Sequence, residues 1–150
     1  MSIIYANKTN INAWVDLSIK LFPDHPFAEM YDTYHEYLIN EEMNQREIGF
    51  LYQVNNQYIA FMNISVRRDY VNGTDTFPVV YIEAIYVLEA YRNRGIGREL
   101  IKKAMHYAKE QGIKQIASDC TIDNTVSELF HKSCGFEEAE RVICFVKNVE

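Results

Sequence analysis

The stretch YRNRGIGREL, residues 91–100, follows VVYIEAIYVL, residues 79–88, and together the two decide the fold. The upstream run is almost continuously β-branched and aromatic, which predicts a strand buried on both faces. Downstream, apolar side chains recur at helical spacing from about Gly95 to Gln111, and Gly112 is a natural helix end. We therefore expect a buried strand, a short turn and a helix in direct succession.

The turn between this strand and helix predicts a binding site for an anion. A helix start leaves backbone N–H groups unpaired at the positive end of the helix dipole, and Gly95 and Gly97 let a ligand approach the backbone. The chain has a formal net charge of -6, yet its one dense basic cluster surrounds these glycines: Arg92, Arg94, Arg98, Lys102 and Lys103. The alternative is a solvated helix start with unrelated arginines. Neither a Walker loop nor a complete three-glycine Rossmann pattern is present.

Apolar spacing along the rest of the chain predicts one domain, residues 1–150, of mixed α/β class. Asn55 and Asn56 tolerate the left-handed backbone of a tight turn, so residues 47–69 are expected to form a β-hairpin. The other expected strands cover residues 2–6, 113–120 and 141–149, and the other expected helices cover residues 11–22, 27–41 and 124–133.

Composition argues against several classes of protein. A sequence pI near 5.2 is unsuited to a general nucleic-acid binder, which needs a broad basic face. The chain has no apolar run long enough to cross a membrane and no signal-peptide features at its start, so we expect a cytoplasmic protein. Cys120, Cys134 and Cys144 are odd in number and lack metal-ligand spacing, so we expect free, mostly buried thiols and no metal site.

The spacing of Arg92, Gly95 and Gly97 after a hydrophobic strand resembles the R/Q-x-x-G-x-G/A motif of the GNAT superfamily of N-acetyltransferases. The order of the expected elements is similar to that fold over the whole chain. The resemblance narrows to the aminoglycoside 6′-N-acetyltransferases through RRDYVNGTDTFPVVYIEAIYVL (67–88), IASDCTIDN (116–124) and GFEEAERVICF (135–145). It implies a central, mostly antiparallel twisted sheet flanked by helices, in which splayed parallel strands form the acetyl-CoA cleft.

The resemblance also implies which residues bind the co-substrate acetyl-CoA. Its pyrophosphate is expected on the backbone amides of the turn, and its pantetheine arm along the preceding strand, where one N–H group polarises the thioester carbonyl. The implied coenzyme-binding residues are Ile85, Tyr86, Val87, Arg92, Asn93, Arg94, Gly95, Ile96, Gly97, Arg98 and Asn124.

The side that receives the acetyl group is expected to be acidic. Residues 16–47 carry eight acidic side chains against Lys20 and Arg46, which suits a polycationic substrate. By resemblance the aminoglycoside contacts are Phe22, His25, Tyr70, Glu83, Asp119 and Glu140, with Phe22 in place of an expected tryptophan. Phe22 and Tyr70 are alternatively ordinary core or loop aromatics, and Glu140 a solvated strand-end charge. Glu83 and Asp119 each interrupt a strand that otherwise looks buried, where an unpaired carboxylate is costly.

The transfer needs a neutral amine, because an ammonium group has no lone pair with which to attack the thioester. We nominate Glu83 as the base, acting directly or through water, and we expect direct transfer within a ternary complex. His131 stands where GNAT enzymes commonly offer a tyrosine that protonates the leaving thiolate. It is either that acid or a packed helix residue.

Two other functions stay open from the sequence alone. One is a GNAT enzyme that acetylates a polyamine or a protein N-terminus, and the other is a non-catalytic acyl-CoA sensor. The presence of Glu83 beside the motif weighs against the sensor. Related enzymes and the apolar stretch VICFV, residues 142–146, favour a homodimer that pairs strands across a subunit boundary.

Overall fold

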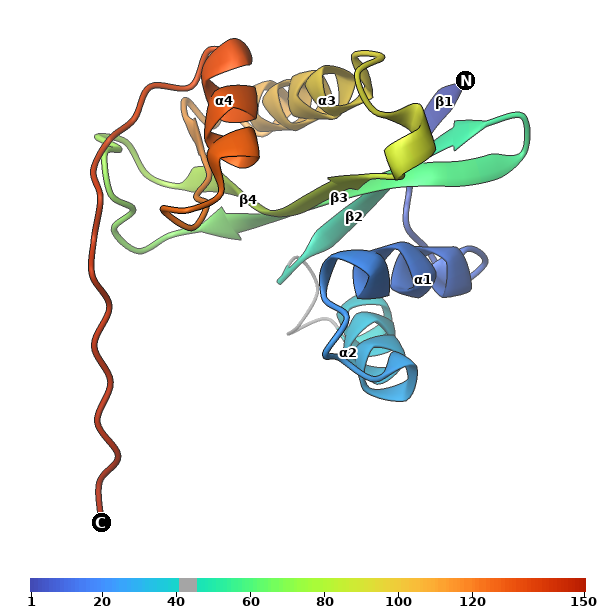
Figure 1. The fold of residues 1–150 in the computed structure, drawn as a ribbon, viewed down its shortest axis with the longest axis horizontal. Coiled ribbons are helices and arrows are strands. Elements are labelled where there is room, and N and C mark those ends of the chain that lie inside the picture. Colours follow the sequence, from blue (N-terminus) through green and yellow to red (C-terminus); the bar gives the residue numbers. More distant parts are fainter. Residues whose placement is uncertain (41–45) are drawn as a thin grey trace.

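The computed structural model describes residues 1–40 and 46–150. Its centre is a five-stranded sheet in the order β1-β2-β3-β4-β5 (Figure 1). The strands are β1 (Ser2–Tyr5), β2 (Ile48–Val54), β3 (Gln57–Arg67), β4 (Val79–Val87) and β5 (Ile116–Ala117). The first four strands pair antiparallel in succession, and β5 runs parallel to β4. The predicted mixed α/β fold with a mostly antiparallel sheet is confirmed.

The hairpin of β2 and β3 forms at the expected place. Its two turn residues, Asn55 and Asn56, have φ angles of 49° and 63°, in the left-handed region that asparagine tolerates. Val54 and Gln57 face each other across the turn, so the two strands begin to pair at once.

Helices cover both faces of the sheet (Figure 1). On one face lie α1 (Ile11–Leu21) and α2 (Phe27–Ile39), and on the other lie α3 (Ile96–Glu110) and α4 (Thr125–Ser133). A single 3-10 turn, η1 (Glu89–Tyr91), joins β4 to the turn before α3. The expected extension of the second helix to Glu41 lies outside the described residues. No helix among the described residues combines the length and the apolar character needed to cross a bilayer.

Each face of the sheet has its own apolar core. Trp14 and Val15 of α1 pack with Leu51 and Phe61 on one face. On the other face, α3 packs Leu100, Ile101 and Ala104 against a second set of strand residues, among them Phe50, Met62 and Ile82. Alternate residues of the same strands therefore enter opposite cores, as the period of a strand requires.

The parallel strands β4 and β5 separate soon after they meet. They pair only at Val80 with Ile116 and at Tyr81 with Ala117. From Ile82 to Val87, this edge of β4 has no neighbouring strand among the described residues. The splayed parallel strands are thus confirmed, whereas the expected strand over residues 113–120 is reduced to two residues.

The expected final strand over residues 141–149 is wrong for this structure. The C-terminal segment, residues 137–150, forms neither helix nor strand and runs away from the body of the molecule (Figure 1). Its apolar side chains are exposed, Phe145 by 91% and Val149 by 97%. A strand needs a hydrogen-bonded neighbouring strand, and the segment has none among residues 1–40 and 46–150. Cys144 lies in this segment, so Cys144 and the equally exposed Cys120 are free but not buried as expected.

Candidate active site

The turn between β4 and α3 has the geometry of an anion site. Gly95 precedes the first residue of α3 with φ 81°, and no side chain caps the helix. The first three amides of the helix, at residues 96–98, have no acceptor within it. A Cβ on Gly95 would meet no atom within 4 Å, so the turn is open on that side.

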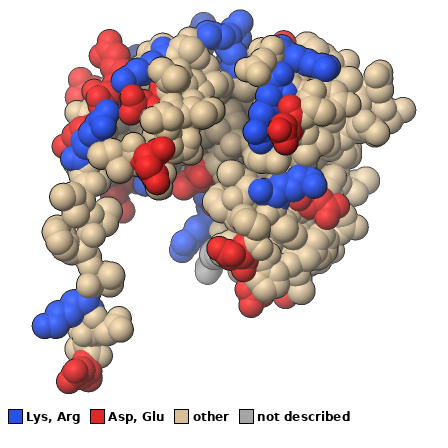
Figure 2. Space-filling model, viewed as in Figure 1, with Lys and Arg blue, Asp and Glu red and all other residues tan. Residues whose placement is uncertain are grey.

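The arginines of the turn form hydrogen bonds to the surrounding backbone and also supply positive charge. Arg92 donates from Nε to the Val87 carbonyl oxygen at 2.8 Å, which ties the turn to the end of β4. Arg98 donates to the Ser133 carbonyl oxygen at 2.7 Å, at the C-terminus of α4. The Arg94 guanidinium lies 5.3 Å from the centre of the Tyr91 ring. Basic side chains gather over this turn on the face drawn in Figure 2.

Gly97 is required by packing rather than by the open turn. A Cβ at this position would lie 2.8 Å from Cε1 of Phe130 in α4. The absence of a side chain therefore lets α3 and α4 approach each other next to the anion site. Close approach by a ligand, the role expected for both glycines, is compatible with the open space at Gly95, whereas the position of Gly97 is filled by Phe130.

The unpaired edge of β4 adjoins the turn. Ile85, Tyr86 and Val87 pair with β3 through Met62, Phe61 and Ala60. Their other edge carries no strand in the described part of the chain. The Val87 carbonyl oxygen on that side already accepts from Arg92 Nε, and the remaining backbone groups on the edge can pair with an extended ligand.

Asn124 caps the short helix α4. Its Oδ1 accepts a hydrogen bond from the Ser127 backbone N–H at 3.0 Å. This cap orders the start of α4, and it leaves the side-chain amide nitrogen of Asn124 as the group for the predicted coenzyme contact.

The His131 ring joins α4 to the segment after β5. Its Nδ1 lies 2.7 Å from the Ser127 carbonyl oxygen, and its Nε2 lies 2.8 Å from Ser118 Oγ. A carbonyl oxygen only accepts hydrogen bonds, so Nδ1 carries a proton, and in the neutral ring Nε2 accepts from the serine hydroxyl. Both nitrogens are thus engaged with the protein, which favours the packed alternative for His131 over the general acid.

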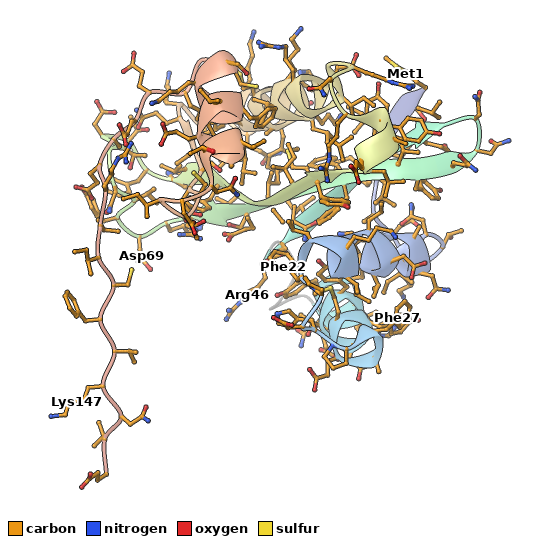
Figure 3. The ribbon with its side chains drawn as sticks, in the orientation of Figure 1. Met1, Phe22, Phe27, Arg46, Asp69 and Lys147 are labelled. Carbon is orange, nitrogen blue, oxygen red and sulfur yellow. The ribbon has the colours of Figure 1, made fainter. Side chains whose placement is uncertain are left out.

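Two adjoining hollows lie against the sheet on the side of α1 and α2. The inner hollow, of about 250 Å³, is lined by Phe22, His25, Glu29, Met30, Thr33, Tyr34, Tyr37, Glu47, Glu83 and Ala84. The outer hollow, of about 680 Å³, is lined by Tyr37, Arg46, Glu47, Ser65, Val66, Arg67, Arg68, Asp69, Tyr70 and Glu83. Tyr37, Glu47 and Glu83 belong to both. Figure 3 shows Phe22 and Arg46 on this side of the sheet, with Asp69 further along it.

The structure brings together four of the six predicted substrate residues. Phe22, His25 and Glu83 line the inner hollow, and Tyr70 joins Glu83 in the outer one. Phe22 is 36% exposed and Tyr70 69% exposed, so neither is a core aromatic. The Phe22 and His25 rings meet edge to face at 6.1 Å.

Asp119 and Glu140 lie elsewhere in this chain. Asp119 follows β5 and is exposed, so the expectation of a carboxylate in a buried strand is wrong for it. It accepts a hydrogen bond from the Tyr81 hydroxyl, and burial together with this bond raises the pKa of Tyr81. Glu140 lies in the exposed C-terminal segment and lines neither hollow.

Glu83 is already engaged with a cation. Arg67 donates to both of its carboxylate oxygens, at 2.9 and 3.0 Å, and the Ser65 hydroxyl donates to Oε1 at 2.6 Å. The same guanidinium lies 3.4 Å above the Tyr81 ring. Arg67 thus links Glu83 to Tyr81 and, through it, to Asp119. As a base, Glu83 has to receive a proton while it is held in this arrangement.

Glu47 was predicted only as one of eight acidic residues, and the structure places it at the junction of the hollows. Its Oε2 accepts a hydrogen bond from Asn63 Nδ2 at 2.7 Å. Burial raises the pKa of the Glu47 carboxyl, the Asn63 hydrogen bond opposes this rise, and the charge of Glu83 adds to it. An asparagine inside an otherwise apolar strand was the signal in the sequence that could have identified this pair. Two of the eight acidic residues, Glu41 and Glu42, lie outside the described residues.

Within residues 1–40 and 46–150, no cluster of three or more His, Cys, Asp or Glu side chains is arranged to hold a metal ion.

Comparison with known proteins identifies relatives over the whole chain. Residues 11–136 match the Acetyltransferase (GNAT) family. The chain is 38% identical over 150 residues to an aminoglycoside N(6′)-acetyltransferase type 1 of Salmonella enteritidis, covering 98% of this chain and 99% of that protein. It is 35% identical to a protein of the same name from Acinetobacter haemolyticus, covering all of both chains.

Solved structures agree with this relationship. The aminoglycoside acetyltransferase AAC(6′)-Iy, in complex with the bisubstrate analogue CoA-S-monomethyl-acetylneamine, superposes with a TM-score of 0.90 at 35% identity, covering 99% of this chain and 98% of that one. The apo structure of AAC(6′)-IG from Acinetobacter haemolyticus has the same TM-score and identity, covering all of both chains.

Proposed function

Because this chain belongs to the Acetyltransferase (GNAT) family, we propose that it transfers the acetyl group of acetyl-CoA to the 6′-amine of aminoglycoside antibiotics and so confers resistance to them. The observation that carries this proposal is the match in sequence and fold, over the full chain, to aminoglycoside 6′-N-acetyltransferases. The open turn before α3 suits the phosphates of the coenzyme, and the acidic hollow beside Glu83 suits a polycationic acceptor. Both adjoin the same sheet, which also supports our proposal of a single domain.

The residues present fit acetyl-CoA, which supplies the acetyl group and departs as CoA. The free amides at residues 96–98, the open space beside Gly95 and the unpaired edge of β4 support the predicted coenzyme contacts. Arg92 and Arg98 add positive charge while holding the turn in place. We propose that a backbone N–H on this edge, within residues 85–87, stabilises the charge that develops on the carbonyl oxygen.

The inner hollow is the proposed site of the drug ring that carries the 6′-amine. Phe22 and His25 offer apolar and aromatic surface, and Glu83 offers a carboxylate. Because Arg67 occupies both oxygens of Glu83, we propose that Glu83 takes the amine proton through a water molecule. The amine then attacks the thioester directly, and no enzyme nucleophile is needed.

A pair of substrates tests this function. Neomycin and paromomycin share a polycationic scaffold and differ at the 6′ position, which is an amine in the first and a hydroxyl in the second. Thiol trapping should detect CoA release with neomycin only, because a neutral hydroxyl is a far poorer nucleophile. Equal release with both drugs would show that another amine is modified. Release with spermidine or a peptide, and with neither drug, would favour a different acceptor.

We also propose that the enzyme is a homodimer and acts in the cytoplasm, where acetyl-CoA is available. The C-terminal segment presents Ile143 and Phe145 to solvent, and Figure 2 shows a largely uncharged surface between the body and its charged end. The outer edge of β5 has no strand beside it within the described residues. An apolar segment and a free sheet edge on the same molecule suit exchange between two copies.

A further inference from the structure

Glu47 stands at the one place where both hollows meet, directly before β2. It lines the inner hollow with Phe22 and His25, and the outer hollow with Arg67 and Tyr70. A group bound in either hollow therefore has access to its carboxylate. Among the described residues, the other carboxylate shared by the two hollows is that of Glu83.

The donor that holds Glu47 has a fixed direction. Asn63 is 1% exposed, and its Oδ1 accepts a hydrogen bond from the indole Nε1 of Trp14 at 2.7 Å. An indole N–H only donates, so the asparagine amide cannot be reversed, and its Nδ2 must face Tyr34 and Glu47. One N–H of Asn63 Nδ2 donates to the Tyr34 hydroxyl at 3.0 Å, and the other donates to the Glu47 carboxylate.

The Tyr34 side of this network is equally directed. The Tyr34 hydroxyl donates to Ser18 Oγ at 2.8 Å, and Ser18 donates to the Trp14 carbonyl oxygen at 2.8 Å. Burial raises the pKa of Tyr34 to about 12, so the hydroxyl stays protonated and keeps its direction as a donor. These hydrogen bonds thus fix the direction of the Asn63 N–H group that holds the Glu47 carboxylate where the two hollows adjoin.

The charge of Glu47 is not balanced within the described part of the chain. No ion pair there involves Glu47, whereas Glu83 is paired with Arg67. The titratable and charged groups that share a hollow with Glu47 are His25, Glu29, Tyr34, Tyr37, Arg46, Arg67, Arg68, Asp69, Tyr70 and Glu83. Placing a carboxylate in a partly buried position without a cation is unfavourable, and a bound cation reverses that cost.

We propose that Glu47 is a specificity-determining residue that binds an ammonium group of the aminoglycoside, supplying the negative charge that Glu83 has committed to Arg67. This inference rests on the proposed function and assigns a substrate contact to a residue that the sequence resemblance did not include. Asn63 acts on the substrate only through Glu47, as a positioning residue. The ligand class is a polyamine sugar with more than one ammonium group.

The test compares Glu47→Gln with Glu36→Gln. The glutamine at residue 47 retains an oxygen for the Asn63 hydrogen bond and removes only the charge. Glu36 is an exposed residue of α2 that lines neither hollow, so its variant has the same change in net charge. Steady-state CoA release is measured at varied neomycin concentration, which gives KM for the drug, and separately at varied acetyl-CoA concentration, which gives KM for the coenzyme. Thermal unfolding is followed with and without neomycin.

For Glu47→Gln we expect KM for neomycin to rise about tenfold or more, because a charge-assisted hydrogen bond is lost. Its kcat should stay within about threefold and its KM for acetyl-CoA should be unchanged. Without drug its Tm should equal or exceed that of the wild type, and the rise in Tm on adding neomycin should shrink. Glu36→Gln should match the wild type in every measurement.

An unchanged KM for neomycin would overturn the proposal, and so would a fall in kcat at constant KM. A lower Tm of Glu47→Gln than of the wild type without drug would show that Glu47 stabilises the fold, and this result would also overturn the proposal. If the wild type released no CoA with neomycin, the proposed function would fail separately. Calorimetric binding of neomycin would then decide the role of Glu47: weaker binding by the variant supports it, and equal binding overturns it.

Discussion

Replacing Gly97 by alanine tests the close packing of α3 and α4 beside the coenzyme turn. The added Cβ would lie 2.8 Å from Phe130 Cε1 and 3.0 Å from Cζ. Carbon atoms in contact keep about 3.5–4.0 Å, so the ring or α4 has to move by roughly 0.7 Å or more. Overpacking of this kind costs about 1–3 kcal/mol. For a chain of this length, the expected fall in Tm is roughly 2–12 °C.

The assay is thermal unfolding together with KM for acetyl-CoA, which should rise because α4 and the turn shift together. Shortening the ring by Phe130→Leu makes room for the new methyl group, so the double variant should be more stable than the sum of the two single changes predicts. Gly95→Ala is the control. Its cost of about 1–2 kcal/mol comes from a left-handed backbone with open space around it, and Phe130→Leu should not relieve that cost.

Two results would contradict a packing role for Gly97. If Gly97→Ala kept its Tm to within about 1 °C, the contact with Phe130 would not limit the approach of the helices. If the effects of Gly97→Ala and Phe130→Leu were simply additive, the destabilisation would have another origin.

Three further predictions address the site and the assembly. Glu83→Gln should lower kcat about 100-fold near neutral pH while KM for acetyl-CoA holds, and turnover within a few-fold of wild type at all pH values would exclude Glu83 as the base. Burial in the folded protein raises the pKa of the Glu47 carboxyl above its value in the unfolded chain. The stability of the wild type is therefore unaffected below the ordinary glutamate pKa and falls as the pH rises from that value through the raised pKa. Over this pH interval the Tm of Glu47→Gln should rise relative to that of the wild type, and a constant difference in Tm would contradict this. Light scattering should give twice the 17.6 kDa chain mass for the wild type, and a chain ending at residue 136 should be monomeric; a monomeric wild type would rule out the strand exchange.

Local spacing along the chain was enough to predict several elements of the fold. The apolar run of β4, the helical period of α3 and the left-handed turn at Asn55 and Asn56 all appear in the structure where they were expected. Each is set by residues close together in the chain, whose backbone preferences and apolar period need no distant partner. The anion turn belongs to this class, because one helix start and one glycine suffice to leave its amides free.

The tertiary structure alone decided what each polar side chain meets. Glu83 and Glu47 are both strand-associated glutamates in the sequence, but Arg67 pairs with the first and only an asparagine amide holds the second. Gly97 depends on Phe130, a residue of another helix. Residues 141–149 have the apolar character of a strand and remain unpaired, because a strand is completed by hydrogen bonds to a neighbour that its own sequence does not contain.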